Sequence, residues 1–320
     1  MVHLIFGLRF AKSATTAQNA GMNKNLQLSR PSGAGQALLL SLILIIGALS
    51  GCVTSMSSNA PVSGVVAGQG LVSVAPKEVI QALAPSGVLR VGAYSGSPTS
   101  MVRDARTGQQ MGITYELGQM LAKRLGVPMQ LVEFSRVAQV LEGIKSGAVD
   151  FTFTNATEIR AKDMHFAQSL VRLELGYLVP TESALKTPIS KLDDIDRAGV
   201  RVGVSQGSSS QGVLGRQFKS AVLVPADSLK QAQEMLAQGR IDAFATNKGI
   251  LFEMAEGLKG VKVLDGRWGV ENLAMAIQRT GPAREISLDF LRRFGAELQA
   301  SGELTAMIKR AGLKGVAAND

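Results

Sequence analysis

The chain has 320 residues, enough for two compact domains and a sizeable core. Apolar residues make up 46% of the chain and charged residues 18%, a balance that excludes a disordered protein. The formal net charge is +9, but four of the 34 basic residues and none of the 25 acidic residues precede residue 52. Without that segment the chain has 30 basic and 25 acidic residues, a mildly basic net charge of +5. The rest of the chain lacks the Lys and Arg clusters that are typical of a nucleic-acid-binding surface.

An apolar stretch, residues 37–49, precedes the single cysteine. As a helix it would be roughly 20 Å long, short of the ~30 Å hydrocarbon core of a bilayer. With Lys24 and Arg30 upstream, this pattern predicts a secretory signal peptide over residues 1–51, or from Met22 if that is the true start. The sequence LSGC resembles the bacterial lipobox, so we expect Cys52 to be lipidated; an unpaired thiol ending a core helix is the alternative.

Residues 53–75 contain no charged residue and are rich in Ser, Gly, Ala and Val. We therefore expect residues 52–75 to form a flexible tether from the lipidated cysteine to a body that begins at residue 76. With one cysteine no intrachain disulfide can form, and His3 and His165 are too few for a His-rich metal site. We expect neither a metal nor a cofactor.

Two pairs of segments repeat in the same order along the chain. LRVGAYSGSPTS (89–100) resembles VRVGVSQGSSSQ (200–211), and SGAVDFTFTNA (146–156) resembles QGRIDAFATNK (238–248). Each first segment is a short apolar strand followed by a Gly/Ser loop, and each second segment shares Gly-x-(Val/Ile)-Asp and a later Thr-Asn. The repetition predicts two lobes with a common plan.

Strands and helices alternate between these repeats. Helices are predicted over 112–126, 137–147, 228–238 and 249–258, and strands over 129–134, 151–154, 202–205, 222–224 and 241–245. Such alternation favours an α/β fold in which each lobe is a doubly wound, mostly parallel sheet. Ligands of such sheets bind beyond the carboxyl ends of the strands.

The last part of the chain, with a strand over 272–278 and helices over 283–300 and 302–311, has no counterpart after the first unit. We expect lobe 1 to span 76–178, lobe 2 to span 179–271, and residues 272–320 to return and pack on lobe 1. Residues 177–180 and 273–277 are then the candidate hinge.

Across residues 87–313 the chain resembles the solute-binding proteins of ABC importers that capture polar amino acids. The resemblance rests on six segments in the family's order: GVLRVGA, GITYELGQMLAKRLG, LEGIKSGAVDFTFTNATEIRAKDMHFAQ, VRVGVSQGSSS, QGRIDAFATN and AELQASGELTAMIKRAG. It implies a periplasmic-binding-protein type II fold, in which two hinged lobes close on a small ligand. It also implies a monomer that delivers its ligand to permease subunits.

The resemblance places Arg160 where the family pairs an arginine with the ligand's carboxylate. A surface arginine bonded to Glu158 or Asp163 is the alternative. Ser208 and Ser209 match the family's hydroxyl pair at a helix N-terminus, where either could also be an N-cap. The remaining candidate ligand-binding residues follow strands and are Tyr94, Thr152, Thr154, Asn155 and Asn247.

The chain departs from the family's pattern at the ammonium site and at the aromatic clamps. Asn247 stands where an aspartate usually binds the ligand's ammonium group, and an amide supplies no countercharge. The places of the family's aromatic side chains read Ser-Pro-Thr-Ser (97–100) and Val137. A small oxyanion or a carboxylate without an ammonium group therefore fits as well as an amino acid.

The function predicted from sequence is an extracytoplasmic binding lipoprotein of an importer that performs no covalent chemistry. Two alternatives stay open: a secreted enzyme resembling cyclohexadienyl dehydratases, and a ligand-sensing module for a partner protein. Residues 203–207 match the G-x-S-x-G pattern of hydrolases, but no histidine follows His165, so Ser205 is not read as a nucleophile.

Overall fold

The computed structural model describes residues 75–104, 106–182, 184–279 and 284–318. The predicted signal peptide, Cys52 and the tether up to residue 74 lie outside the described residues. None of the described helices combines the length and the apolar composition that a bilayer crossing requires.

Most strands belong to one nine-stranded sheet with the order β4-β1-β5-β11-β6-β9-β7-β8, and β10 pairs with β6. The strands are β1 (Leu89–Tyr94), β4 (Met129–Phe134), β5 (Phe151–Asn155), β6 (Met164–Pro180), β7 (Arg201–Ser205), β8 (Val222–Ala226), β9 (Ala243–Asn247), β10 (Val261–Val263) and β11 (Gly269–Gln278). A separate ribbon pairs β2 (Val102–Arg103) with β3 (Gln110–Met111). The helices are α1 (Lys77–Leu83), α2 (Ile113–Leu125), α3 (Val137–Ser146), η1 (Arg160–Lys162), η2 (Leu192–Asp194), α4 (Ser209–Gln217), α5 (Leu229–Ala237), α6 (Lys248–Gly257), α7 (Arg284–Ala300) and α8 (Glu303–Arg310).

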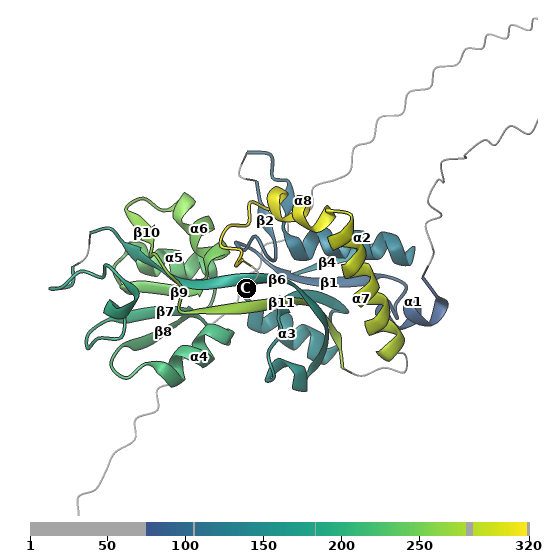
Figure 1. Cartoon of the computed structure of the whole chain (residues 1–320), viewed down its shortest axis with the longest axis horizontal. Helices are drawn as coiled ribbons and strands as arrows, with labels where there is room; N and C mark the ends of the chain where they lie inside the picture. Colours follow the sequence, from purple (N-terminus) through teal and green to yellow (C-terminus); the bar gives the residue numbers. More distant parts are fainter. Residues whose placement is uncertain (1–74, 105, 183, 280–283, 319–320) are drawn as a thin grey trace, which may run out of the picture. The chain divides into compact units, whose positions relative to one another are not determined.

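The sheet has two parallel halves, which are the two lobes. In the first lobe β1 pairs in parallel with β4 and β5, and in the second β7 pairs in parallel with β8 and β9. The long strands β6 and β11 pair antiparallel to their neighbours and run from one lobe to the other (Figure 1). This is the predicted two-lobed α/β fold.

The crossing between the lobes differs in position from the predicted hinge. Residues 273–277 of β11 pair with β5, inside the first lobe, and residues 175–180 of β6 pair with β9 and β10, inside the second. The connecting stretch is therefore 172–175 of β6 opposite 269–272 of β11. Of β6, only residues 177–180 were considered from the sequence. The rest was missed because the strand changes its pairing partners along its length, so its hydrophobic residues follow no single periodicity.

The sequence repeat has a physical basis in two matching ion pairs. In the first lobe, Asp150 accepts hydrogen bonds from the backbone N and from Nε of Arg90, both at 2.9 Å. In the second lobe, Asp242 accepts the same two bonds from Arg201, at 2.8 and 3.0 Å. Each aspartate thus joins the start of its strand to the neighbouring parallel strand, which explains why Gly-x-(Val/Ile)-Asp recurs.

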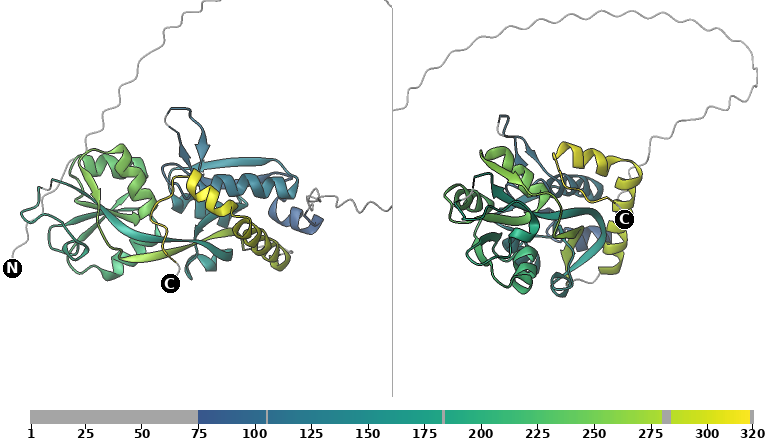
Figure 2. Two further views of the ribbon diagram at one scale, coloured as in Figure 1. Left: turned by 45° about the horizontal axis from the view of Figure 1, so that its top comes forward. Right: turned by 60° about the vertical axis from the view of Figure 1, so that its left-hand side comes forward.

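The chain's final helices belong to the core of the first lobe. Leu291 and Phe294 of α7 and Met307 of α8 are buried in the same cluster as Leu117 and Leu121 of α2. Figure 2 shows α7 and α8, in yellow, on the side of the sheet that carries α2.

A terminal segment, residues 313–317, continues from α8 along β6. Leu313 is buried in the first-lobe core, the backbone N of Glu174 donates to the carbonyl of Gly315 (2.9 Å), and Val316 bridges to Leu173. Lys314 reaches Glu256 of α6, 2.7 Å away. The segment therefore joins the first-lobe core to a helix of the second lobe beside the crossing.

Candidate functional site

A cavity of about 40 Å³ lies between the strand ends of the two lobes. Among the described residues, eight from the first lobe, eight from the second, and Glu271 and Leu273 of the crossing strand β11 line it. The lining residues used below are Tyr94, Arg136, Thr154, Asn155, Arg160, Ser208, Ser209, Asn247 and Glu271. Seven of the eight predicted ligand-binding residues are among the lining, as expected for side chains at the carboxyl ends of parallel strands.

Arg160 is buried beneath the cavity, with 9% of its surface exposed. Its Nη1 donates to Thr154 Oγ1 (2.8 Å) and to the carbonyl oxygen of Asn155 (3.0 Å). Burial lowers the pKa of its guanidinium. In the described part of the chain Arg160 forms no ion pair, and Asp163 lies near Lys145 instead (3.4 Å). The guanidinium is thus a buried cation held by neutral groups, with Nε and Nη2 available to an anion in the cavity.

The N-terminus of α4 lies at the same cavity from the second lobe. Ser208 is its N-cap, and its Oγ accepts a hydrogen bond from the backbone N of Gln211 (3.2 Å). The Ser209 hydroxyl accepts from Asn155 Nδ2 across the interface between the lobes (3.3 Å). The helix end therefore presents hydroxyl and N–H groups toward the cation on the opposite lobe.

Thr152 is the predicted site residue that does not line this cavity. It is buried within β5, and its Oγ1 donates to the carbonyl oxygen of Gly92 at 2.9 Å. Thr152 and Thr154 share a face of the strand, but Thr152 is two residues deeper, about 7 Å along the strand. We do not assign Thr152 to the site.

Asn247 lies at the cavity and its amide orientation is fixed. Its Oδ1 accepts from the backbone N of Ile250 (3.0 Å), so it is the N-cap of α6. Its Nδ2 must then point the other way, where it donates to Glu271 Oε1 at 2.8 Å. The amide of residue 247 carries no charge itself, but it donates a hydrogen bond to a carboxylate of β11 that also lines the cavity.

Glu271 was not identified from the sequence. It is 7% exposed and lines the cavity. Burial raises the pKa of its carboxyl to about 7, against the opposing effects of the Arg160 charge and the Asn247 hydrogen bond. The only signal in the sequence was a single acidic residue shortly before the apolar run LAMAIQ. An acidic residue at that place is equally typical of the beginning of a strand.

Several contacts hold the two lobes together around the cavity. Arg136 Nη1 lies 3.3 Å from Asp227 Oδ1 on the second lobe. A Cβ built on Gly207 would lie 2.6 Å from Cβ of Ala138, so the loop before α4 approaches α3 closely. Among the described residues, Nε of Arg136 is buried without a hydrogen-bond partner. These contacts describe a closed arrangement of the lobes.

A larger cavity of about 650 Å³ adjoins the first and shares Arg160, Ser208 and Ser209 with it. Its walls are α3 and η1 on one side and the start of α4 on the other, with Leu141 and Ile159 among the apolar residues. The inner cavity has room for about three water molecules. A molecule larger than a polar head group would therefore extend into the outer cavity.

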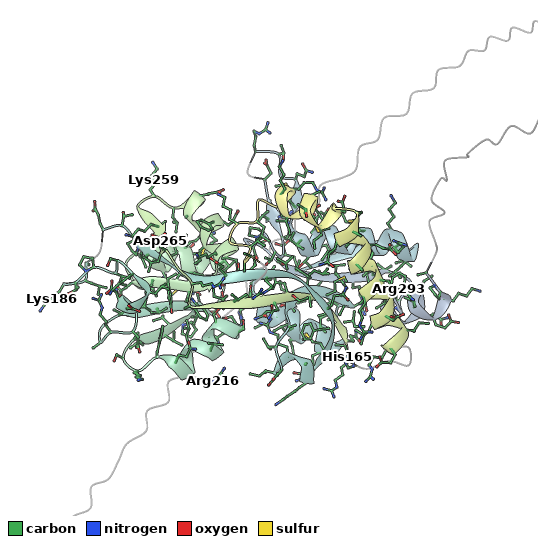
Figure 3. The ribbon with its side chains drawn as sticks, viewed as in Figure 1. His165, Lys186, Arg216, Lys259, Asp265 and Arg293 are labelled. Atoms are coloured by element: carbon green, nitrogen blue, oxygen red, sulfur yellow. The ribbon has the colours of Figure 1, made fainter. Side chains whose placement is uncertain are left out.

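Two other residues considered from sequence have different environments. Tyr94 is partly buried at the cavity, and the desolvation of its hydroxyl raises the pKa of that group. His165 lies in β6 on the first lobe, where Nε2 is 3.1 Å from the carbonyl oxygen of Arg279, and it is not among the lining residues (Figure 3). A role for His165 in the chemistry of the cavity has no support in this arrangement.

Comparisons with known proteins agree with this architecture. Residues 89–312 match the model of the bacterial extracellular solute-binding proteins, family 3. A mutant of ArgBP from T. maritima superposes with a TM-score of 0.63 at 20% identity, covering 72% of this chain and 98% of that one. A binding component of an ABC transporter from Wolinella succinogenes, complexed with lysine, superposes with a TM-score of 0.59 at 23% identity, covering 70% and 95%.

Two further relatives have names that point to other activities. An ancestral amino acid-binding protein, described as a precursor of cyclohexadienyl dehydratase, superposes with a TM-score of 0.62 at 22% identity over 72% of this chain and 98% of that one. The virulence sensor protein BvgS of Bordetella pertussis is 28% identical over 142 residues, which are 43% of this chain. The match spans only 11% of the length of that curated relative.

Proposed function

Because the chain belongs to the bacterial extracellular solute-binding proteins, family 3, we propose that it captures a small carboxylate-bearing solute between its lobes and performs no covalent chemistry on it. The observation that carries this proposal is Arg160: a buried guanidinium at the cavity, without an acidic partner among the described residues. Burying an unpaired cation is costly, and an anionic ligand removes that cost.

The ligand's carboxylate would accept hydrogen bonds from Nε and Nη2 of Arg160 in a bidentate pair. The same carboxylate would face the N-terminus of α4, where Ser208 and Ser209 supply hydroxyl and N–H groups. Since Arg160 belongs to one lobe and α4 to the other, such a ligand makes its full set of contacts only when the lobes are closed. Binding then shifts the population toward the closed form. The rest of the ligand would occupy the outer cavity.

The test is the loss of binding on substituting Arg160. A thermal-shift screen of amino acids, organic acids, phosphonates and sulfonates identifies a ligand, since binding to the folded state raises the unfolding temperature. Calorimetric titration of that ligand should then show no binding to Arg160→Ala and unchanged binding to Arg293→Ala, an arginine on the exposed face of α7 (Figure 3). Circular dichroism checks that both variants are folded. Unchanged affinity in Arg160→Ala would refute the proposal.

We further propose that the protein works outside the cytoplasm as a monomer, anchored through a lipid on Cys52, and passes its ligand to the permease subunits of an ABC importer. The lipobox-like sequence and the family support this role. The similarity to part of BvgS supports an alternative recipient, a sensor protein that recognises the closed form. Growth on the ligand as sole nutrient, with and without the protein, separates import from sensing.

Glu271 supports a second candidate, a dehydratase activity on cyclohexadienyl acids. From sequence the cleft lacked a general acid, but this carboxyl lines the cavity and its pKa of about 7 keeps part of it protonated at neutral pH. It could give its proton to a departing hydroxyl, which leaves as water, while loss of CO₂ supplies the electron pair of the new ring double bond. Formation of phenylpyruvate from prephenate by wild type, but not by Glu271→Gln, would establish this activity.

A further inference from the structure

We propose that the outer cavity binds an apolar arm of the ligand, so that the solute captured by this protein is a carboxylate with an alkyl or aryl chain. This inference rests on the proposed function, because it takes the carboxylate of the ligand to be bound by Arg160. It goes beyond that function by assigning a chemical class to the rest of the ligand.

The inner cavity is too small for more than the head group of a ligand. Its volume of about 40 Å³ has room for about three water molecules, which matches the carbon and two oxygens of a carboxylate group. Arg160, Ser208 and Ser209 line both cavities, so a carboxylate bound to them lies where the two cavities meet. The remainder of the molecule must then extend into the outer cavity.

The outer cavity has apolar residues from both lobes. Leu141 of α3, Ile159 at the start of η1 and Met164 of β6 line it from the first lobe. Val213 of α4 lines it from the second. Figure 1 shows α3 and α4 on the same side of the crossing strands β6 and β11. An apolar arm between these helices would cover apolar surface of both lobes, and removing that surface from water favours binding in the closed form.

Ile159 is the most exposed part of this apolar lining. Its exposed fraction of 64% is the largest among the large apolar side chains that the structure describes. Single exposed apolar side chains are common on protein surfaces, but Ile159 lines a hollow together with Leu141 and Val213. It also directly precedes Arg160, so an arm that leaves the bound carboxylate would begin beside it.

The charged residues around the outer cavity do not require a charged arm. Lys145 of α3 lies 3.4 Å from Asp163, so these two charges offset each other. Three further charged residues of the lining are exposed, where water solvates them: Glu142, Glu158 and Arg216. Among the described lining residues, Arg160 is therefore the one buried charge. The arrangement matches a ligand with one anionic end and an apolar remainder.

The experiment uses straight-chain carboxylates that differ only in length: propanoate, pentanoate and heptanoate. A fourth ligand, 6-aminohexanoate, has the shape of heptanoate but ends in an ammonium group instead of a methyl group. Thermal shift detects binding, and calorimetry at pH 7 and constant ionic strength measures the dissociation constants. The proteins are full-length wild type, Arg160→Ala, Ile159→Ser, Val213→Ser and Ile286→Ser. Ile286 is an exposed residue of α7 that lines neither cavity, so it gives the matched change elsewhere.

We expect the affinity of wild type to rise about two- to fourfold with each added methylene group, because each one removes apolar surface from water. Heptanoate should bind more tightly than 6-aminohexanoate, whose charged end would lose part of its hydration. Ile159→Ser and Val213→Ser should bind propanoate as wild type does, but heptanoate roughly three- to tenfold more weakly. Ile286→Ser should match wild type throughout.

The inference is overturned if affinity does not rise with chain length, or if 6-aminohexanoate binds more tightly than heptanoate. It is also overturned if Ile159→Ser and Val213→Ser both keep the wild-type affinity for heptanoate. In these cases, carboxylate binding that is lost in Arg160→Ala leaves the proposed function intact. If heptanoate binds Arg160→Ala as tightly as wild type, the proposed function fails as well. If none of the three carboxylates binds, the inference fails, and the wider ligand screen decides the proposed function.

Discussion

Replacing Glu271 by glutamine should stabilise the ligand-free protein, and the gain should depend on pH. The carboxyl of Glu271 is buried, and its pKa rises from 4.5 to about 7 in the folded protein. At 1.36 kcal/mol per pH unit, this difference corresponds to roughly 3 kcal/mol of unfavourable free energy when the group is ionised. Glutamine has the same shape and can still accept the hydrogen bond from Asn247, so it removes the charge with little change in packing.

The sign follows from proton binding. Because the pKa is higher in the folded state, the folded protein holds a proton between about pH 4.5 and pH 7 that the unfolded chain releases. The contribution of Glu271 to stability is therefore fully present below the lower value and is lost as the pH rises through the higher one. The advantage of Glu271→Gln over wild type should be below about 1 kcal/mol at pH 5 and about 3 kcal/mol at pH 8.

Urea-induced unfolding at the two pH values, followed by circular dichroism and by the fluorescence of the single tryptophan, Trp268, measures this difference. Glu234→Gln, at an exposed residue of α5, is the matched control and should show no such pH-dependent gain. The protein must first be unfolded and refolded to remove any bound ligand, which would stabilise wild type. An equal effect of Glu271→Gln at pH 5 and pH 8, or a loss of stability at pH 8, would refute the electrostatic reasoning.

Three further predictions concern the scaffold around the site. Asp150→Ala should cost about 3–5 kcal/mol in the free energy of unfolding, because the carboxylate is 3% exposed and its loss leaves Arg90 unpaired; a cost under about 1 kcal/mol in urea unfolding would argue against this role. Asp227→Asn should weaken ligand binding by no more than about fivefold, because it removes the exposed carboxylate that contacts Arg136 between the closed lobes; calorimetric titration measures the change, and tighter binding would contradict the reasoning. Gly118→Ala should destabilise by about 1–3 kcal/mol, since a Cβ there would lie 2.7 Å from Val91 Cγ2. Gly215→Ala, also in a helix, is the control: the added Cβ meets no atom nearer than 3.7 Å, so this substitution should stabilise the protein by up to about 1 kcal/mol. Equal effects of the two substitutions in thermal unfolding would show that the close contact with Val91 does not determine the loss of stability.

The sequence predicted the lobes well because their signals are local. Helices α2 and α3 end at Gly126 and Gly147, which both adopt the left-handed conformation that favours glycine, and both ends were predicted to within a residue. The repeated segments predicted the common strand arrangement of the two lobes, because Asp150 and Asp242 accept the same backbone hydrogen bond from the neighbouring parallel strand in each lobe. Strand β6 was largely missed, since each of its parts is buried against a different partner.

Arg160 was identified through the resemblance to the family, and the other candidate residues because they follow strands. Arg160, Ser208 and Asn247 all line the cavity. Glu271 could not be found by the same reasoning, because it reaches the cavity from a crossing strand whose neighbours are distant in sequence. Its burial depends on the pairing of β11 with β6, and its charge makes sense only once Asn247 is seen to donate to it.

The terminal segment, residues 313–317, affects where a fluorescent label could report the movement of the lobes. Residues 313–317 bond to the backbone of β6 beside the crossing, and Lys314 is tied to α6. Opening the lobes must twist or shear these bonds, so the tail adds torsional stiffness to the pivot. A fluorophore attached to residues 313–317 would be held by both lobes at once and would register their movement poorly. Removing this segment would soften the pivot and make the empty protein open more readily.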